Sequence, residues 1–363
     1  MNFYTTHRFM KRIIFVCNLF EVLKKIVMQN FNLKLFFKCL FLFFILTIDI
    51  YSKPYISAKA AVVLDVTSNQ FIYLKNEHLR LPPASTLKLL TAMIAVDKFR
   101  MNKMVTVPSS VKSIAPYKIH LKPGDKYKTL DLLYALLLRS ANDVAHTLAV
   151  RISGSERKFA RLMNKKAEII GLKHSNFKNP HGLPDSHQYV TAKDMALLTN
   201  FVRQYPLLIE VLNKKTKQFK GPGNKKINLI SRNKLLFQKF RPKVLGKTGY
   251  TRLAGRCFAG FTFGVKTPVV IILLKSVDRW GDLKILAKWA DHFYRAKINR
   301  NKQLLNKDQI ITCQKFLKDY GFLRGEVDGV FGTQTEAAIL RLQHKKNLKV
   351  DGVVGPKTLS YIS

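Results

Sequence analysis

Short apolar runs, separated by turn residues, predict β-strands near both ends of the main part of the chain. Residues 60–66 (AAVVLDV) and 70–74 (QFIYL) are apolar and β-branched, and the polar segment 67–69 (TSN) separates them. This pattern predicts a β-hairpin. Two further runs, 244–251 and 256–265, are expected to be paired strands, and 269–274 is expected to be a third.

Longer patterns with helical spacing lie between these two groups of strands. The clearest predicted helix is 85–98, which begins after two prolines. The other predicted helices cover residues 129–139, 155–170, 191–204 and 281–295. Strands at both ends with helices between them imply an α+β fold, in which the two halves of the chain close one antiparallel sheet flanked by helices.

A polar stretch, 297–310, is predicted to be a linker, and a repeated pattern follows it. The pattern Asp-Gly-x-x-Gly-x-x-Thr occurs at 328–335 and again at 351–358. Each Asp-Gly is expected to form a tight turn, and each second glycine is expected to precede a helix. Pro356 suits a first helical position, and Thr333 and Glu336 have the spacing of a capping box. Residues 311–363 are therefore predicted to form a small module of three short helices.

The first 52 residues have the pattern of an export signal. An apolar run of ten residues, 39–48 (CLFLFFILTI), follows Lys34 and Lys38. It is short for a membrane span but suits a signal-peptide core, and Ser52 offers a small residue for cleavage. Met28 is an alternative start that gives a signal peptide of ordinary length. The prediction is a periplasmic or other extracytoplasmic location, with membrane attachment only if the segment remains uncleaved.

Size and composition agree with one large and one small domain. The chain has 363 residues, of which 47% are hydrophobic, so it can build a substantial core. We expect a catalytic domain over 53–296, a linker over 297–310 and the small module over 311–363. Of the four cysteines, Cys257 and Cys313 lie one in each domain, so we expect buried thiols and no disulfide framework.

The net charge of +41 is extreme. Lys, Asn, Ile and Phe are all abundant, as in proteins from AT-rich genomes, so composition accounts for most of this charge. Attraction to an anionic polymer or surface, such as a bacterial envelope, is the functional alternative. None of the known nucleic-acid-binding modules is present in the sequence, so nucleic acid is not an expected partner.

Three short motifs carry the candidate chemistry. They are STLK at 85–88, SAN at 140–142 and KTG at 247–249, in that order along the chain. Ser-x-x-Lys alone arises by chance in a chain so rich in lysine. The ordered set of three is the signature of enzymes that acylate a serine with penicillin or a D-alanyl peptide.

The first two motifs supply a nucleophile and its proton acceptor. A serine hydroxyl needs a base, and Lys88 lies one helical turn after Ser85, on the same side. Lys88 acts as a base only when neutral, which requires burial and a neighbouring cation; Lys247 is expected to be that cation. Ser140 is expected to relay the proton to the leaving amine, and Asn142 to hold the amide backbone of the substrate.

The third motif is expected to bind the substrate. Lys247 and Thr248 would bind its free carboxylate, and Gly249 would let it lie against the strand edge. The backbone N–H groups of Ser85 and Tyr250 are the expected oxyanion donors. The alternative is that the three strings are unrelated: a helix cap, a surface lysine and a turn.

These motifs and their neighbours resemble the low-molecular-mass penicillin-binding proteins, the serine D-alanyl-D-alanine carboxypeptidases, over about residues 56–296. The resemblance rests on five strings: PASTLK at 83–88, SAND at 140–143, NPHGLP at 179–184, TAKDMA at 191–196 and KTGYT at 247–251. It implies the penicillin-binding or serine β-lactamase-like fold, with a helical subdomain. It also implies attack on the terminal D-Ala-D-Ala bond of peptidoglycan stem peptides through a Ser85 acyl-enzyme, with β-lactams as inhibitors.

The C-terminal part, 311–363, resembles a peptidoglycan-binding domain of the three-helix type. Such a domain would hold the enzyme on the glycan polymer that it cuts and so raise the local substrate concentration. Many relatives carry a C-terminal β-rich domain followed by an amphipathic membrane helix. This sequence shows neither pattern, so anchoring through the C-terminal part is not expected.

Two other patterns suggest different chemistry. His174, His181, Asp185 and His187 are close in sequence, as zinc ligands often are, but they fall in and beside the NPHGLP string, so no metal or cofactor is expected. Glu210 begins a string that loosely echoes the deacylating glutamate of class A β-lactamases. The string is one residue short and too far from Ser140, so efficient β-lactam hydrolysis is not expected.

Two further functions remain open at this point. A D,D-endopeptidase acting on peptidoglycan cross-links would use the same motifs, which do not separate it from a carboxypeptidase. A non-catalytic wall-binding protein would keep the fold only to hold a ligand. Intact Ser85, Lys88 and Lys247 argue against that last function.

Overall fold

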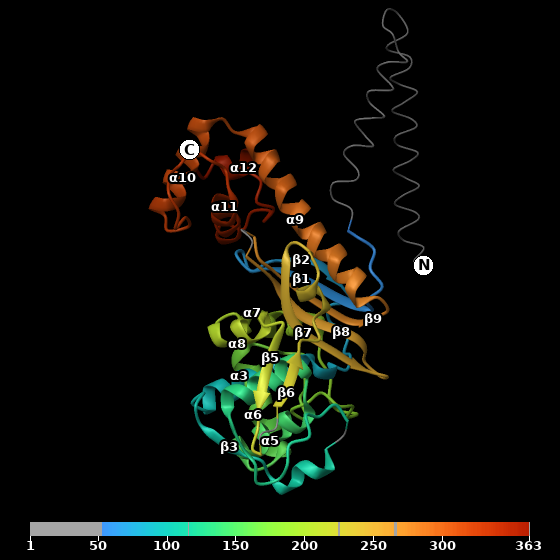
Figure 1. Cartoon of the computed structure of the whole chain (residues 1–363). Helices are drawn as coiled ribbons and strands as arrows, with labels where there is room; N and C mark the ends of the chain where they lie inside the picture. The colour runs from blue at the N-terminus through green and yellow to red at the C-terminus, as the bar shows by residue number, and fades with distance from the viewer. Residues whose placement is uncertain (1–52, 115, 224–225, 265–266, 363) are drawn as a thin grey trace, which may run out of the picture. The chain divides into compact units, whose positions relative to one another are not determined.

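The structure is a computed structural model that describes residues 53–362, except 115, 224–225 and 265–266 (Figure 1). The expected export signal over 1–52 lies outside the described residues. Within the described part of the chain, no helix has both the length and the apolar character needed to cross a membrane.

A five-stranded antiparallel sheet forms the centre of the catalytic part, with the strand order β2-β1-β9-β8-β7. Its strands are β1 (Ala60–Asp65), β2 (Phe71–Lys75), β7 (Lys243–Thr251), β8 (Gly255–Phe263) and β9 (Val269–Ser276). Strand β1 pairs with β9, with Ala60 opposite Leu274. The two ends of the domain therefore close one sheet, which confirms the predicted fold class, and β7 is left at an edge.

Both faces of the sheet are covered, which explains why β1 is apolar without alternation. Val62 and Leu64 point into a core shared with the helical region, whereas Ala61 and Val63 point into a second core under α9 (Arg279–Leu304). Figure 1 shows α9 along one side of the sheet and the helical region on the other. Side chains that alternate between two buried faces must all be apolar.

The helical region contains α3, α5, α6, α7 and α8. The bounds of its elements are η1 (Ala84–Leu87), α3 (Lys88–Lys98), β3 (Met104–Thr106), η2 (Ser109–Ser113), β4 (Lys126–Lys128), α4 (Thr129–Tyr134), η3 (Ala135–Arg139), α5 (Asn142–Ser153), α6 (Glu156–Ile170), α7 (Ala192–Val202), α8 (Pro206–Asn213), β5 (Thr216–Lys220), β6 (Lys226–Ile230) and η4 (Lys234–Phe237).

Four local features differ from the sequence prediction. The helix expected over 85–98 begins with the 3₁₀ turn η1, and the helix expected over 129–139 changes to the π-helical turn η3. The hairpin β5–β6 was not predicted: both strands carry lysines, and Phe219 and Leu229 are their fully buried residues. Helix α9 continues to Leu304, so residues 297–304 are helical where a linker was expected.

The C-terminal module contains three helices around its own core, as predicted: α10 (Lys307–Asp319), α11 (Thr333–Lys345) and α12 (Pro356–Leu359). Pro356 occupies a first helical position. The capping box expected at Thr333 does not form, because Gly332 is the residue that precedes α11. A capping box is found instead at Asn306 and Gln309, before α10.

In each copy of the repeated pattern, a buried glutamine on the preceding helix forms hydrogen bonds with the Asp-Gly turn. The Gln314 side chain bonds the first Asp-Gly turn and Thr335. Gln343 does the same in the second copy: its amide donates to Val353 O and Thr358 Oγ1, and its oxygen accepts from Gly352 N at 2.8 Å. One side chain thus supplies the hydrogen bonds that each turn needs.

We expect Gln343→Ala to destabilise the module by about 3 kcal/mol, because it leaves several buried backbone groups unpaired. Amide hydrogen exchange of α11 in the full chain would report the loss. Gln334→Ala, at an exposed position on the same helix, is the matched control and should change stability by less than about 0.5 kcal/mol. Equal exchange in the two variants would contradict the anchoring role.

Candidate active site

The three sequence motifs lie together in the structure. Ser85 is in η1, Lys88 is the first residue of α3, Asn142 is the first residue of α5, and Gly249 is on the edge strand β7. Lys88 Nζ lies 3.0 Å from Ser85 Oγ and 2.8 Å from Asn142 Oδ1. A side chain on Gly249 would come within 3.0 Å of the Ser85 backbone nitrogen. Glycine is therefore required where β7 passes the Ser85 turn.

Lys88 has the surroundings of a neutral amine. Its side chain is fully buried, and its third hydrogen bond goes to the His181 carbonyl oxygen at 2.6 Å. Burial, and then the charge of Arg232, hold the pKa of Lys88 well below its usual range. A neutral amine has two N–H groups and one lone pair. Asn142 Oδ1 and His181 O can accept the two N–H bonds, which leaves the lone pair for the Ser85 hydroxyl.

Lys247 is also buried, and it donates to Thr248 O at 2.9 Å. Burial lowers its pKa well below the usual range, and the charges of Lys88 and Arg232 lower it further. From the sequence, Lys247 was the predicted cation that lowers the pKa of Lys88. In the structure the neighbouring cation with the largest effect on Lys88 is Arg232.

Ser140 and Asn142, the two polar residues of the second motif, differ in their hydrogen bonds. Ser140 has a left-handed backbone (φ 63°), and its buried hydroxyl has no hydrogen-bond partner among the described residues. Its hydrogen-bonding capacity is therefore unused by the described residues. Each polar atom of the Asn142 side chain has a partner: its Oδ1 accepts from Lys88, and its Nδ2 donates to Pro116 O at 2.6 Å. In this structure Asn142 orients Lys88, and the second proton of its Nδ2 is left for the expected contact with the substrate.

Two arginines beside the third motif were missed by the sequence analysis. Arg279, at the start of α9, donates to Gly249 O at 2.9 Å and to Cys257 O at 3.1 Å, and burial lowers its pKa to about 10. The Arg232 guanidinium lies 5.0 Å from the centre of the Tyr117 ring. Both arginines act electrostatically on Lys247. In a chain with 63 lysines and arginines, no sequence signal distinguishes them.

Of the remaining predicted site residues, Thr248 is buried on β7, and Tyr250, two residues later, is 56% exposed. Tyr250 follows Gly249 directly on β7, the strand that passes the Ser85 turn. This placement is compatible with the expected oxyanion role of Tyr250 and Ser85.

The NPHGLP string forms a loop, 179–184, that braces the Ser85 turn. Thr91 Oγ1 donates to Pro180 O at 2.7 Å, and Gly182 N donates to Asn179 Oδ1 at 2.8 Å. The histidines of this region are used in other ways: His174 packs against His78, and His187 is exposed. Among the described residues, no group of His, Cys, Asp and Glu could hold a metal ion.

Gly182 is the tightest point of this loop. It has φ +85°, and a Cβ atom would lie only 1.9 Å from the Ala84 carbonyl oxygen. We expect Gly182→Ala to displace the Ser85 turn and to slow acylation by a β-lactam about 100-fold, measured by stopped-flow kinetics. Gly171→Ala is the matched control: it has the same strained backbone (φ +88°) but open space around the Cβ position. If both variants slow acylation equally, backbone strain alone explains the effect.

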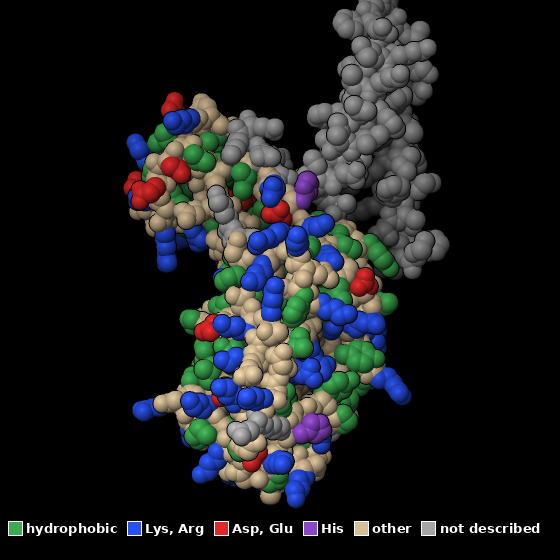
Figure 2. Space-filling model, in the orientation of Figure 1, with side chains coloured by type: hydrophobic (Ala, Val, Ile, Leu, Met, Phe, Trp, Pro, Cys, Tyr) green, Lys and Arg blue, Asp and Glu red, His purple; other side chains and the backbone are tan. Residues whose placement is uncertain are grey.

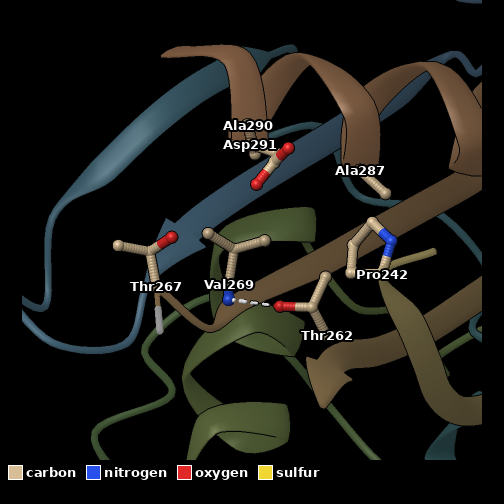
Figure 3. A pocket seen from close by; sticks show the side chains of 7 residues that line it. All are labelled: Pro242, Thr262, Thr267, Val269, Ala287, Ala290 and Asp291. Carbon is tan, nitrogen blue, oxygen red and sulfur yellow. Dashed lines mark hydrogen bonds between the residues drawn. The ribbon is translucent and has the colours of Figure 1, made fainter. Parts of the chain in front are cut away.

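A small cavity lies away from this site, between the sheet and α9 (Figure 3). Its volume is about 10 Å³, and its lining includes Thr262, Val269 and Asp291. Thr262 Oγ1 accepts a hydrogen bond from Val269 N across it. Such a volume holds one water molecule at most, so this cavity is not a substrate site.

Lysine and arginine side chains are distributed over the visible face of the protein and do not form one patch (Figure 2). This distribution agrees with the compositional explanation of the net charge.

A serine on a helical turn, a buried lysine one turn later and a strand-edge Lys-Thr-Gly are the combination that defines penicillin-recognising serine enzymes. Residues 48–277 match the family model of D-alanyl-D-alanine carboxypeptidases, and residues 306–362 match that of a peptidoglycan binding domain. The chain belongs to the D-alanyl-D-alanine carboxypeptidase family. The predicted family resemblance and the predicted C-terminal domain type are thereby confirmed.

Individual relatives include both carboxypeptidases and endopeptidases. The chain is 32% identical over 228 residues to the D-alanyl-D-alanine carboxypeptidase DacF of Bacillus subtilis, covering 58% of each protein. It is 29% identical over 243 residues to a D-alanyl-D-alanine endopeptidase of Pseudomonas aeruginosa, covering 65% of this chain and 78% of the relative. The match thus spans little more than half of the Bacillus protein.

Solved structures share the fold. The crystal structure of penicillin-binding protein D2 from Listeria monocytogenes in the ampicillin-bound form superposes with a TM-score of 0.58 at 28% identity. That match covers 67% of this chain and 100% of the Listeria chain.

Proposed function

We propose that the protein is an exported serine D-alanyl-D-alanine carboxypeptidase that removes the terminal D-alanine from peptidoglycan stem peptides. The observation that carries the proposal is the Ser85–Lys88 pair. Lys88 is fully buried and has a strongly lowered pKa, and its Nζ lies 3.0 Å from the Ser85 hydroxyl. A nucleophile beside a neutral amine is what acyl transfer at neutral pH requires.

The first half of the reaction forms an acyl-enzyme. Lys88 Nζ takes the Ser85 proton as Oγ attacks the carbonyl carbon of the penultimate D-alanine. The backbone N–H groups of Ser85 and Tyr250 stabilise the oxyanion. Lys88 then gives up its proton, through the unpartnered Ser140 hydroxyl, to the amine of the leaving D-alanine. The peptide C–N bond breaks, and a serine ester remains.

Hydrolysis completes the cycle. Water attacks the ester carbonyl, Lys88 accepts its proton, and the Ser85 hydroxyl is restored as the shortened peptide leaves. The substrate carboxylate would bind Lys247 and Thr248. Arg232 and Arg279, which act electrostatically on Lys247, add positive charge there. A β-lactam would acylate Ser85 in the same way and remain bound.

The C-terminal module would hold the enzyme on the glycan polymer. Because it is matched to peptidoglycan binding domains, we infer that it raises the substrate concentration at the catalytic domain. The proposed substrate, the stem peptide, and the proposed binding partner, the glycan polymer, both lie in the cell envelope. This supports the periplasmic or other extracytoplasmic location inferred from the N-terminal sequence.

Endopeptidase action on cross-links is the second candidate, supported by the Pseudomonas relative. Digestion of purified muropeptides distinguishes the two. Free D-alanine without loss of dimers supports a carboxypeptidase, whereas conversion of dimers to monomers supports an endopeptidase.

Labelling with fluorescent penicillin tests the acyl-enzyme directly. We expect one label per protein molecule, stable to denaturation. A folded protein that takes up no label and releases no D-alanine would instead be a non-catalytic wall-binding protein.

A further inference from the structure

Glu156, the first residue of α6, joins three segments around the active site but plays no part in the mechanism above. Its Oε1 lies 2.8 Å from His146 Nδ1 and 3.4 Å from His181 Nε2. His146 is on α5, one turn after Asn142, and His181 is in the loop 179–184. Both imidazole rings are buried, whereas the Glu156 side chain is 26% exposed.

The surrounding hydrogen bonds fit neutral histidines. Leu183 N donates to His181 Nδ1 at 3.3 Å, so the ring proton belongs on Nε2, where it faces Glu156. Ser110 Oγ lies 2.8 Å from His146 Nε2 and can donate to it, which leaves the Nδ1 proton for Glu156. Two neutral rings therefore each donate one hydrogen bond to the same carboxylate oxygen.

Glu156 is a charged acceptor at working pH. Its burial opposes ionisation, but the hydrogen bonds from His146 and His181, together with the positive charge of these rings when they are protonated, outweigh this and lower its pKa to about 2. Hydrogen bonds to an ionised acceptor are stronger than those between neutral groups.

The two segments that Glu156 joins also carry two of the three hydrogen-bond partners of Lys88. Asn142 Oδ1, on α5, lies 2.8 Å from Lys88 Nζ, and His181 O, in the loop, lies 2.6 Å from it. The third partner is the nucleophile Ser85. The direction of the Lys88 lone pair thus depends on the separation of α5 and the loop 179–184.

We propose that Glu156 is a positioning residue for the acylation step. Its carboxylate fixes α5 against the loop 179–184, so that Asn142 and the His181 carbonyl aim the Lys88 amine at the Ser85 hydroxyl. Within the described residues, the Glu156 carboxylate makes its polar contacts with His146 and His181, so it acts through these two histidines. This inference rests on the proposed acyl-enzyme function.

The test is the acylation of the full chain by nitrocefin, a chromogenic β-lactam, followed by stopped-flow absorbance. We expect Glu156→Ala to lower the first-order acylation rate constant about 10- to 100-fold, because a base displaced by a fraction of an ångström transfers protons poorly. The dissociation constant of the non-covalent complex should change less than about threefold, since the contacts on β7 are intact. Glu156→Gln keeps an oxygen acceptor and should restore the rate constant to within about fivefold of wild type.

Glu168→Ala, at an exposed position on the same helix, is the matched control and should acylate as wild type does. Circular dichroism gives the folded fraction of each variant, and each rate constant is normalised to that fraction. If Glu156→Ala does not fold, Glu156→Asp replaces it: its carboxylate is one methylene shorter, and the same split between rate and binding is expected.

Three outcomes would overturn the proposal: wild-type acylation by folded Glu156→Ala, equal changes in the rate and dissociation constants, or no rescue by Glu156→Gln. Failure of the proposed function is distinguishable, because then wild type itself would not be acylated.

Discussion

Replacing Ser85 by alanine is expected to abolish penicillin labelling and to lower D-alanine release about 10⁴-fold or more. The variant loses the only atom to which the acyl group is transferred, while Lys88 keeps its bonds to Asn142 Oδ1 and His181 O. Ser85 is in a 3₁₀ turn, and among the described residues its hydroxyl makes one other, long hydrogen bond, to His181 O at 3.5 Å. The fold should therefore be retained. Fluorescent-penicillin gels and a D-alanine assay on purified stem peptide measure the two effects.

Ser186→Ala is the matched control for Ser85→Ala. Ser186 is an exposed serine just beyond the loop 179–184, and its variant should label as wild type does. Labelling of Ser85→Ala at the wild-type level would mean that another residue is acylated, and the proposed mechanism would then be wrong.

The sheet was predictable because its side chains obey simple rules. The strand β1 reads as a continuous apolar run because Val62 and Val63 face two different cores. The hairpin β5–β6 escaped prediction for the opposite reason: its outward side carries lysines, and a single buried residue per strand, Phe219 or Leu229, gives little periodic signal. The helical extension through 297–304 is polar in sequence, but the buried side chain of Asn301 bonds the backbone of the C-terminal module there.

The candidate site was predictable where chemistry needs a particular side chain. The spacing of Ser85 and Lys88 places both on one turn, and the structure brings them to 3.0 Å. The His181 carbonyl gives no sequence signal, since every residue has a carbonyl group. Arg232 and Glu156 also escaped, because an arginine in a basic chain and a glutamate at a helix start are ordinary until the fold places them beside Lys88 and His181.

Lys88 gives the second prediction, which concerns pH. The amine accepts the Ser85 proton only when it is neutral, so acylation should slow as pH falls through the lowered Lys88 pKa and reach a plateau above it. Lys88→Arg should acylate about 10³-fold more slowly and should not recover in alkali, because a guanidinium stays charged. Stopped-flow acylation from about pH 5 to about pH 10 measures both effects.

The matched control for this prediction is Lys98→Arg, an exposed lysine at the end of the same helix, which should keep the wild-type profile. A buried arginine could also disturb packing, so Lys88→Met, which is uncharged and of similar length, separates the two causes. It should fold normally, since methionine places no charge in the buried site, yet acylate as slowly as Lys88→Arg. If Lys88→Met acylates at the wild-type rate, or if wild-type acylation does not change with pH, the base is not Lys88. The proton must then pass to a group other than Lys88.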